Sequence, residues 1–525
     1  MIQTDHLTLS FGGRTLFEDV NAKFLPGNCY GLIGANGAGK STFLKILSGD
    51  IQPTKGEVVI GDKKRISVMK QNQFEYDEFT VMDTVLMGHT ELFTIYDERN
   101  KLYAKPSLTE AEGLRAGDLE SIFGDMDGYT AESDAATLLS DLGLPESLHQ
   151  TQMSALEAGQ KVRVLLAQAL FGNPDILLLD EPTNQLDYKS VLWLEQFLYD
   201  FPNTVIIVSH DRHFLNKVCT HIADLDFKQI RLYAGNYDFW LQSSQLVMKQ
   251  KQDLHKKSSE KIKELEDFIR RFSANASKSK QATSRKKLID TLRPDELPVS
   301  SRKSPYISFK VKRPCGTNIL TVKNLSYTLG DAVLFKNLSF SLEKKDKLAI
   351  LAENTLAKTT LLSLLAGKLQ PQTGTIEWGE GSVYDYFPKD NSEYFGKDTP
   401  LLDWLNEKNS GLDNQTLRGY LGRMLFSGDE AKKNVKVLSG GEKARAMFAK
   451  LMLSEGNVLL FDEPTDHLDL ESISALNIGL SQFTDCLIMT SHDFELLNTV
   501  PNRFIEITPT GFREKRGSFE DFLGN

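Results

Sequence analysis

The sequence is poor in cysteine and has no long apolar run. Its four cysteines lie far apart in 525 residues, and no two form a CxxC pair. This spacing argues against a zinc site or a disulfide framework and favours a reducing compartment. No stretch approaches the roughly 18 apolar residues of a membrane-spanning helix, and the N-terminus has no apolar signal region. We therefore expect a cytoplasmic protein that does not enter a membrane.

An excess of positive charge is also absent. The chain has 61 Lys and Arg against 71 Asp and Glu, a formal net charge of -10. A nucleic-acid binder with a uniformly basic surface is therefore excluded, although a local basic patch is not. A chain of this length exceeds what one hydrophobic core supports, so two or more domains are expected.

Most of the chain is an internal repeat. Lys40 corresponds to Lys358 at an offset of 318, whereas Glu181 of LLLDEPT corresponds to Glu463 of LLFDEPT at an offset of 282. The difference of 36 (318 minus 282) places an insertion in the first copy, downstream of Gln71. The inserted sequence is rich in charged and helix-forming residues, which predicts a helical hairpin. A surface elaboration without a role is the alternative interpretation.

The connection between the copies differs in charge from the rest of the chain. Residues 249–293 contain 14 Lys or Arg and 6 Asp or Glu, a local charge of +8. The pattern predicts two helices joined by the polar turn SANASKSK. A solvated pair of charged helices without a binding partner is the simpler interpretation. The expected domains are residues 1–240 with an arm at about 90–130, a basic helical linker at 241–316, and residues 317–525.

A phosphate-binding pattern opens the first copy. The segment IGANGAGKST contains Gly34-x4-Gly39-Lys40-Ser41, after the apolar run CYGLIG and before a helix-forming run. Glycines let backbone N–H groups curl around phosphates, while the lysine reaches the terminal phosphates and the hydroxyl binds Mg²⁺. We therefore expect a P-loop that binds ATP and Mg²⁺.

Two later segments complete the expected site. The apolar run ILLLD predicts a buried parallel strand that ends in Asp180 and Glu181. Asp180 is expected to hold the magnesium shell, and Glu181 is expected to polarise the attacking water. The run VIIVSH predicts a second buried strand that brings His210 beside the terminal phosphate.

These motifs resemble those of the ATP-binding-cassette ATPases. In that family ATP lies between the P-loop of one domain and the LSGGQ-type signature of the other, and the intact signature here, LSGGE, is in the second copy. The resemblance implies an α/β fold of two tandem P-loop cassettes, a charged helical linker and a helical hairpin inserted in the first cassette. It also implies a monomer whose cassettes pair within the chain.

The resemblance assigns residues to the first ATP site. The catalytic pair is Glu181 and His210. The ATP-binding residues are Phe11, which would stack on adenine, and Gly34, Asn36, Gly37, Gly39, Lys40, Ser41, Thr42, Gln71, Asp180, Ser439, Gly440, Gly441 and Glu442. Ser41, Gln71 and Asp180 would also hold the metal.

The second site departs from the family pattern. Its loop, LAENTLAKTT, has Ala352, Thr355 and Ala357 where the first loop has glycines, and side chains there disfavour positive φ. Further departures are Glu353 in the loop, Lys389 in place of Gln71, Leu329 in place of Phe11, and Glu157 and Ala158 in the first signature. The family residues that remain are Lys358, Thr359, Thr360, Asp462, Glu463 and His492. We predict that this second site binds ATP weakly or not at all and hydrolyses it poorly.

Two directly fused cassettes with a charged linker and an arm resemble the bacterial ABC-F group, and within it the YbiT-like subfamily. That resemblance implies an ATPase that binds the ribosomal tRNA exit site, modulates translation and leaves on hydrolysis. Large-subunit rRNA and tRNA are the implied partners. The candidate RNA-binding residues are Arg270, Arg271, Lys278, Lys280, Arg285, Lys286 and Lys287.

Three other functions remain open. A transporter motor subunit is disfavoured by the linker and by the lack of a membrane span. A DNA-associated ATPase is disfavoured because the chain ends at GSFEDFLGN, without a C-terminal coiled coil. A regulatory ATP binder that does not hydrolyse is disfavoured by the intact Glu181 and His210, although the altered second site favours it.

Overall fold

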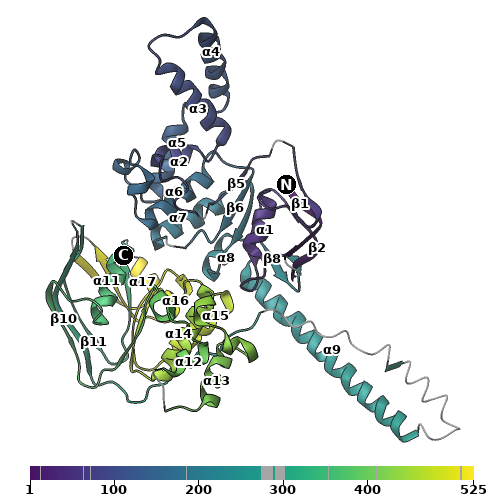
Figure 1. The fold of residues 1–525 in the computed structure, drawn as a ribbon, viewed down its shortest axis with the longest axis vertical. Coiled ribbons are helices and arrows are strands. Elements are labelled where there is room, and N and C mark those ends of the chain that lie inside the picture. The colour runs from purple at the N-terminus through teal and green to yellow at the C-terminus, as the bar shows by residue number, and fades with distance from the viewer. Residues whose placement is uncertain are drawn as a thin grey trace.

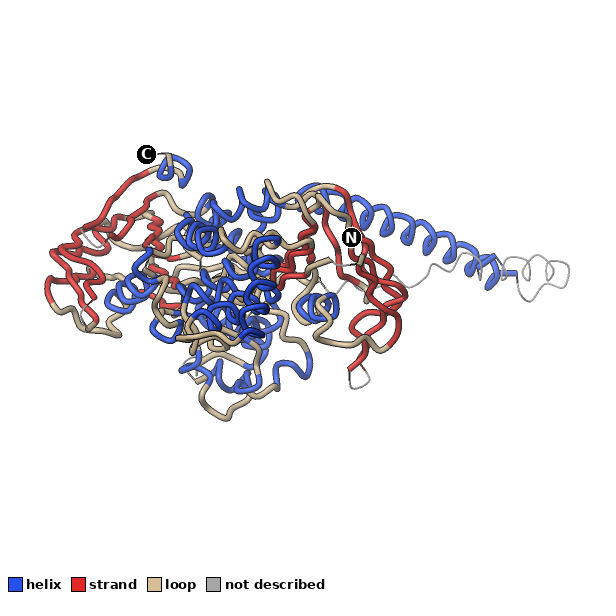
Figure 2. The backbone as a smooth tube through the Cα atoms, turned by 90° about the horizontal axis from the view of Figure 1, so that it is seen from above, coloured by secondary structure: helices blue, strands red, loops and turns tan. Residues whose placement is uncertain are grey.

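The structure is a computed structural model, and it describes the whole chain except residues 12, 13, 63, 71, 185, 273–287, 290–301, 331, 353, 408–410, 509, 510 and 525. Two cassettes lie against each other, an arm stands out from the first, and a long helix projects away from both (Figure 1). The strands of the two cassettes lie at opposite ends, with helices between them (Figure 2). The expected fold class is therefore confirmed.

The first cassette contains two sheets. A three-stranded antiparallel sheet has the order β2-β1-β4, and a six-stranded, mainly parallel sheet has the order β5-β6-β7-β3-β8-β9. Their strands are β1 (Ile2–Phe11), β2 (Arg14–Phe24), β3 (Cys29–Ile33), β4 (Lys55–Ile60), β5 (Ile66–Val68), β6 (Ile176–Asp180), β7 (Thr204–Val208), β8 (His221–Asp226) and β9 (Gln229–Ala234). The central strands β3, β6 and β7 are almost wholly buried, as their apolar runs require.

Helices cover the larger sheet and form the arm. They are α1 (Lys40–Leu47), α2 (Val81–Leu86), α3 (Thr90–Tyr103), α4 (Glu110–Asp125), α5 (Ala131–Asp141), α6 (Ala158–Leu170), α7 (Tyr188–Tyr199) and α8 (Arg212–Val218), with short 3-10 helices at Glu146–Leu148 and Met153–Ala155. Helices α3 and α4 form the hairpin that stands out in Figure 1. A capping box at Thr109 and Glu112 starts α4.

The second cassette repeats this plan without the arm. Its sheets have the orders β11-β10-β13 and β14-β15-β16-β12-β17-β18. The strands are β10 (Asn318–Leu329), β11 (Ala332–Glu343), β12 (Lys347–Ala352), β13 (Thr373–Trp378), β14 (Tyr384–Phe387), β15 (Val458–Asp462), β16 (Cys486–Thr490), β17 (Arg503–Thr508) and β18 (Gly511–Arg516). The helices are α11 (Thr355–Leu365), α12 (Leu401–Asn406), α13 (Asn414–Arg423), α14 (Gly440–Ser454), α15 (Leu470–Gln482), α16 (Phe494–Thr499) and α17 (Phe519–Leu523), with 3-10 helices at Ser392–Phe395, Gly428–Lys432 and Val435–Val437.

The connection between the cassettes begins as one long helix. Helix α9 spans Tyr237–Phe272 and so begins four residues before residue 241, where the linker was expected to start. The second linker helix expected from the sequence falls largely outside the described residues. Residues 302–316, which were also assigned to the linker, instead run along the second cassette, because Ile307 and Phe309 belong to its hydrophobic core.

Arg302 joins three parts of the molecule at the base of α9. Its guanidinium lies 2.6 Å from Asp224 on β8 and 3.4 Å from Glu471 on α15. It also lies 4.5 Å from the ring centroid of Trp240 on α9. The first cassette, the long helix and the second cassette therefore meet at one side chain.

The two cassettes contact each other directly. The rings of His213 and Phe494 stack with centroids 3.8 Å apart, and Arg212 lies 3.7 Å from Glu495. Tyr188 donates a 3.3 Å hydrogen bond to Glu506. None of the helices within the described parts of the chain is both long and apolar enough to cross a membrane.

Candidate functional site

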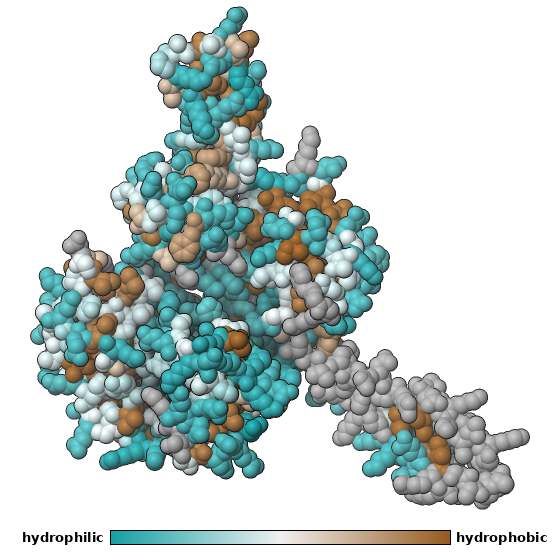
Figure 3. Space-filling model, viewed as in Figure 1, coloured by the Kyte–Doolittle hydropathy of each residue, from teal (hydrophilic) through white to brown (hydrophobic). Residues whose placement is uncertain are grey.

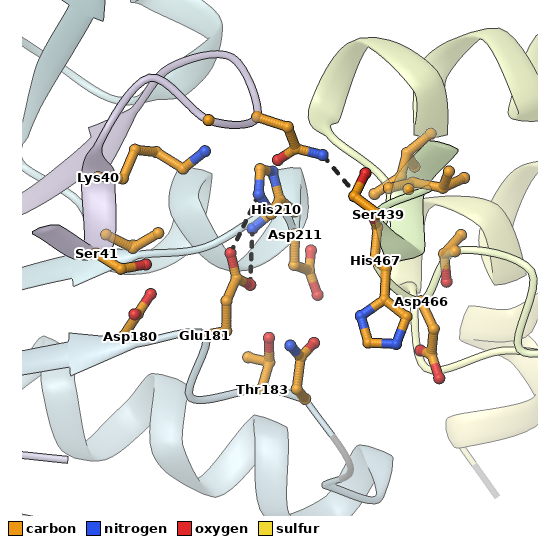
Figure 4. Close-up of a pocket in the computed structure, with 18 of the residues that line it drawn as sticks. Lys40, Ser41, Asp180, Glu181, Thr183, His210, Asp211, Ser439, Asp466 and His467 are labelled. Carbon is orange, nitrogen blue, oxygen red and sulfur yellow. Dashed lines mark hydrogen bonds and ion pairs between the residues drawn. The ribbon is translucent and has the colours of Figure 1, made fainter. Parts of the chain in front are cut away.

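The first site is a cavity of about 860 Å³ between the two cassettes. In parallel sheets, ligands bind beyond the carboxyl ends of the strands, and three such ends meet here. Lys40 and Ser41 begin helix α1, directly after the loop that follows β3. The end of β6 supplies Asp180 and Glu181, and the end of β7 leads to His210. The opposite wall comes from the second cassette (Figure 4).

The first P-loop is shaped by glycines at positive φ. Gly37 has a φ of 76° and Gly39 a φ of 106°, which L side chains rarely adopt. A Cβ on Gly37 would meet no atom within 4 Å, so this turn is open toward the cavity. Lys40 follows directly and donates hydrogen bonds to the carbonyls of Gly34 and Ala35, at 2.8 and 3.4 Å.

Glu181 and His210 form a buried pair. Glu181 Oε1 lies 3.3 Å from Nε2 of the His210 ring, and the backbone N–H of His210 donates a 3.2 Å hydrogen bond to Glu181 Oε2. Burial, with the neighbouring Asp180 charge, raises the pKa of Glu181 to about 8. Burial and then the Lys40 charge lower the pKa of His210 to about 3. Both side chains are therefore mainly uncharged at neutral pH in this state.

Several features of the first site fit a magnesium nucleotide. His210 Nδ1 is buried and lacks a hydrogen-bond partner among the described residues, so it can serve a bound ligand or water. Glu181 also has a φ of 53°, a strained value for a non-glycine residue that is typical of functional sites. The open P-loop turn next to these groups suits phosphate oxygens.

The second signature lies on the facing wall. Ser439 caps α14, and its Oγ accepts a 3.3 Å hydrogen bond from the Glu442 N–H. Ser439, Gly441 and Glu442 line the cavity. Asn36 of the P-loop reaches across to the second cassette, where its side-chain amide donates a 3.5 Å hydrogen bond to the carbonyl of His467. The structure thus brings the first P-loop and the second signature into one site.

Some expected residues take other positions. A Cβ on Gly34 would lie 2.7 Å from the Leu225 carbonyl, and one on Gly440 would lie 3.1 Å from the His467 ring, so both glycines permit close packing. Neither is among the lining residues, whereas Asn36, Gly37, Gly39, Lys40, Ser41 and Thr42 are. Gln71 lies outside the described residues. Phe11 ends β1, but its side chain is outside the description.

Sequence reasoning missed part of the cavity wall. Thr465, which ends the DEPT motif of the second cassette, and Asp466 and His467, which follow it, line the first site. Burial and then the Glu463 charge raise the pKa of Asp466 to about 7. The sequence repeat marks this segment, because TNQLD of the first copy and TDHLD of the second correspond at the offset of 282.

The described residues of the second site form no comparable phosphate loop. Helix α11 begins at Thr355, whereas the corresponding α1 begins at Lys40, so Thr355, Leu356 and Ala357 form an extra stretch of helix. The Asn354 side chain caps this helix by accepting a 2.8 Å hydrogen bond from the Leu356 N–H. Loss of the glycines therefore replaces the loop by helix rather than leaving a crowded loop.

Lys358 of the second site is held by its own cassette. Its Nζ donates a 2.8 Å hydrogen bond to Glu463 Oε1 and lies 3.1 Å from His492 Nε2. The side chains of Lys358 and Glu463 are 3% and 0% exposed. Burial opposes ionisation of Glu463, but the facing His492 and the Lys358 charge outweigh it and lower the Glu463 pKa to about 2. The result is a closed, buried ion pair.

The remaining second-site residues are engaged in the same way. Asp462 accepts hydrogen bonds from Thr490, at 2.8 Å, and from Thr359. The Lys389 charge also lowers the pKa of Glu463. Thr360 follows in α11 and is half-buried. Lysine ammonium groups thus stand near the carboxylates that hold magnesium and water in other cassettes.

Across from this loop, the first signature leaves a smaller cavity of about 420 Å³. Among the described residues of the second loop, Asn354 lines this cavity. Glu157 caps α6, and its N–H donates a 3.1 Å hydrogen bond to Gln160 Oε1. The departure at Glu157 from the signature serine therefore preserves a capping box.

Comparisons with known proteins agree with the fold of two cassettes. A family model described as ABC transporter matches residues 17–184 and 335–466, and another with the same description matches residues 223–309. A structure of an archaeal ribosome recycling factor, in complex with a ribosomal stalk protein, has a TM-score of 0.64 at 18% identity. That match covers 99% of this chain and 92% of the other, and it shows a shared fold.

Closer relatives are similar along the full length. The chain is 53% identical to the uncharacterized ABC transporter ATP-binding protein YkpA of Bacillus subtilis, over 100% of this chain and 98% of that protein. It is 47% identical to the probable ATP-binding protein YbiT of Escherichia coli O157:H7, over 100% and 99%. It is 30% identical to ABC transporter F family member 3 of Arabidopsis thaliana, over 99% and 74%. The chain therefore belongs to the ABC-F family of proteins with two ATP-binding cassettes.

Proposed function

We propose that this protein is an ATP-driven translation factor that hydrolyses ATP mainly at the first site. The observation that carries the enzymatic part is the cavity shared by the first P-loop and the second signature. ATP bound there would touch both cassettes and hold them together. Hydrolysis would remove that link and let the cassettes separate.

The residues of the first site suit ATP hydrolysis. Lys40 can leave the loop carbonyls and reach the terminal phosphates, and Ser41 and Asp180 would hold the magnesium ion. A bound magnesium ion would neutralise phosphate charge. Glu181, once ionised, would take a proton from the attacking water, and His210 would orient the terminal phosphate.

The second site has a structural role in this proposal. The Lys358–Glu463 ion pair joins helix α11 to the residue that follows strand β15. Lys358 would have to leave a buried partner before it could bind phosphate, and the helical start of α11 provides no glycine turn. We infer that this site is a fixed internal contact of the second cassette, with little or no affinity for ATP.

The ribosome is the proposed partner because of the family and the long helix. With 36 residues and a rise of about 1.5 Å per residue, α9 is about 54 Å long. It projects from the cassettes in a different direction from the arm (Figure 1). In ABC-F factors such a linker implies contact with tRNA and large-subunit rRNA from the tRNA exit site.

The residues proposed to contact RNA remain predictions. Arg270 and Arg271 lie in the last turn of α9, although their side chains are not described, and Lys278, Lys280, Arg285, Lys286 and Lys287 lie outside the described residues. Replacing these seven residues by Gln should weaken ribosome binding and reduce its dependence on salt. Unchanged binding would contradict this assignment.

Co-sedimentation with ribosomes tests the proposal. A Glu181→Gln variant, which binds ATP but cannot activate water, should pellet with 70S particles or large subunits only when ATP is present. Lys40→Ala is the matched control and should stay in the supernatant with or without ATP. A Glu181→Gln variant that binds ATP yet never pellets would contradict the ribosomal assignment.

A further inference from the structure

A trough at the base of the arm lies apart from the ATP site. It has a volume of about 910 Å³ and is bounded by α5, α7, the base of the arm and the loops before β6 and β7. Its floor is a row of aromatic rings, with Trp193 and Phe197 stacked at 5.2 Å and Phe197 and Phe201 at 5.8 Å. All three side chains remain partly exposed. A row of partly exposed aromatic rings is a feature of interaction surfaces.

The rim of this trough is acidic. Four aspartates line it, Asp127, Asp134, Asp141 and Asp200, with no lysine or arginine among the described lining residues. Two of them, Asp134 and Asp141, lie two turns apart on the same face of α5. Residues 90–145 as a whole contain 12 Asp or Glu and 4 Lys or Arg, a charge of -8. The surface of the arm is largely hydrophilic (Figure 3). This field repels phosphate and attracts cationic groups.

The corresponding face of the second cassette is covered by the chain itself. At the repeat offset of 282, Phe197 corresponds to Gly479 and Phe201 to Phe483. A Cβ on Gly479 would lie 2.8 Å from the carbonyl of Ile307, so Ile307 rests on this helix. The ring of Phe309 meets that of Phe483 edge-on, with centroids 6.4 Å apart.

The covering segment, residues 304–313 (SPYISFKVKR), runs through the equivalent of the whole trough. The Tyr306 N–H donates a 2.8 Å hydrogen bond to the carbonyl of Arg423, which corresponds to Asp141. The Lys312 N–H donates a 3.1 Å hydrogen bond to the carbonyl of Glu455, which corresponds to Asn173. Asp141 and Asn173 both line the trough of the first cassette.

The segment shows which chemistry fits such a face. Ile307 and Phe309 are 4% and 9% exposed, while Tyr306 before them and Lys310 and Lys312 after them are exposed. This is the alternation of an extended chain with one apolar and one basic edge. Its contacts are backbone hydrogen bonds to the rim and apolar side chains on the floor.

We propose that the trough of the first cassette binds an extended basic segment of a partner protein, laid across it as residues 304–313 lie on the second cassette. The proposal is independent of ribosome binding and of ATP hydrolysis. Two differences between the faces define the partner. Trp193 and Phe197 replace Ala475 and Gly479, so the partner needs a small residue above these rings. Asp141 replaces Arg423, so the partner needs a basic residue at the end of its segment that lies over Asp141, where Tyr306 lies on the second cassette.

Peptide binding to the full-length chain tests the proposal. Three fluorescein-labelled decapeptides would be titrated and followed by anisotropy: the sequence of residues 304–313, the same with Lys at the position of Tyr306 and Gly at the position of Ile307, and a version of this second peptide with Glu at its four basic positions. We expect saturable binding of a basic peptide, tightest for the Gly version, weaker at high salt. The acidic peptide should not bind. An oligouridylate probe should neither bind the trough nor displace the peptide.

Matched charge variants locate the binding. Asp141→Arg gives the trough the charge found at Arg423 and should weaken peptide binding at least about tenfold. Asp118→Arg, on the exposed side of α4, makes the same change in net charge away from the trough and should leave binding within about twofold. Both variants should keep ATP-induced thermal stabilisation, which shows that they fold.

Three results would overturn the proposal. One is that neither basic peptide saturates. Another is that the Asp118→Arg and Asp141→Arg variants weaken binding equally, which would reduce the effect to overall charge. The third is displacement of the peptide by oligouridylate in the wild-type protein, which would make the trough a nucleic-acid surface.

Discussion

Lys358 is predicted to stabilise the second cassette rather than to bind ATP. In Lys358→Met, the Glu463 carboxylate, which is 0% exposed, loses its 2.8 Å partner. Removing one member of a buried ion pair costs about 3–5 kcal/mol, because the remaining charge stays buried and, here, keeps only His492 at 3.1 Å and the Lys389 charge to compensate it. We therefore expect the free energy of unfolding of the second cassette to fall by about 3–5 kcal/mol at neutral pH, with ATP affinity unchanged.

The loss should also depend on pH in a defined direction. Because the Glu463 pKa is lowered to about 2 from its ordinary 4.5, the pair stabilises the folded state above about pH 4.5. This stabilisation disappears as the pH falls from about 4.5 toward 2, when the carboxylate takes up a proton. The difference between wild type and Lys358→Met should therefore be largest at neutral pH and narrow in acid.

Tryptophan fluorescence during urea unfolding can measure this in the full chain. Trp378 and Trp404 lie in the second cassette, and replacing the other two tryptophans, Trp193 and Trp240, by Phe leaves emission from that cassette alone. Adding Glu463→Gln to Lys358→Met should restore much of the stability, since no buried charge then remains. The reasoning fails if Lys358→Met costs under about 1 kcal/mol, or if it abolishes ATP binding.

Three further predictions follow from the first site and the linker. Gly39→Ala would place an alanine at a φ of 106°, a strain of about 1–3 kcal/mol that should weaken ATP binding about 5- to 150-fold. Calorimetry would measure the affinity. The control Ala357→Gly, in the second loop, should leave the affinity for ATP unchanged. Since the Glu181 pKa is raised to about 8 and the base must be ionised, kcat/KM for ATP should rise with pH until about 8, and a flat profile below 8 would exclude Glu181 as the base. Arg302→Met leaves the buried Asp224 carboxylate without its cationic partner, which should destabilise the protein by about 3 kcal/mol. Limited proteolysis should then cut faster at the base of α9. An unchanged digestion pattern would contradict the role of Arg302 in joining the cassettes to α9.

The main features of the first site could be predicted from the sequence because motif spacing determines them. The repeat offsets, the apolar strands and the intact P-loop predicted which strand ends meet, and the structure brings Lys40, Glu181 and His210 into one cavity with Ser439. The packing roles of Gly34 and Gly440 could not be predicted, because they depend on residues distant in sequence.

The second site shows what a motif comparison cannot reveal. Loss of three glycines indicated a damaged loop, but a longer helix and the Lys358–Glu463 pair depend on side-chain geometry that no spacing encodes. Residues 304–313 are a different case, since the alternation of Ile307, Phe309 and Val311 with polar residues was visible in the sequence. Their position between the two copies of the repeat led to their assignment as linker.

The number of ATP molecules bound per chain tests the central claim most directly. Equilibrium dialysis of the Glu181→Gln variant with labelled ATP and Mg²⁺ would count bound nucleotide without loss by hydrolysis. If only the first site binds ATP, because the Lys358–Glu463 ion pair closes the second, this variant should bind one ATP per chain. It should bind none after Lys40→Ala is added. Two ATP per chain, or one that survives Lys40→Ala, would contradict this account.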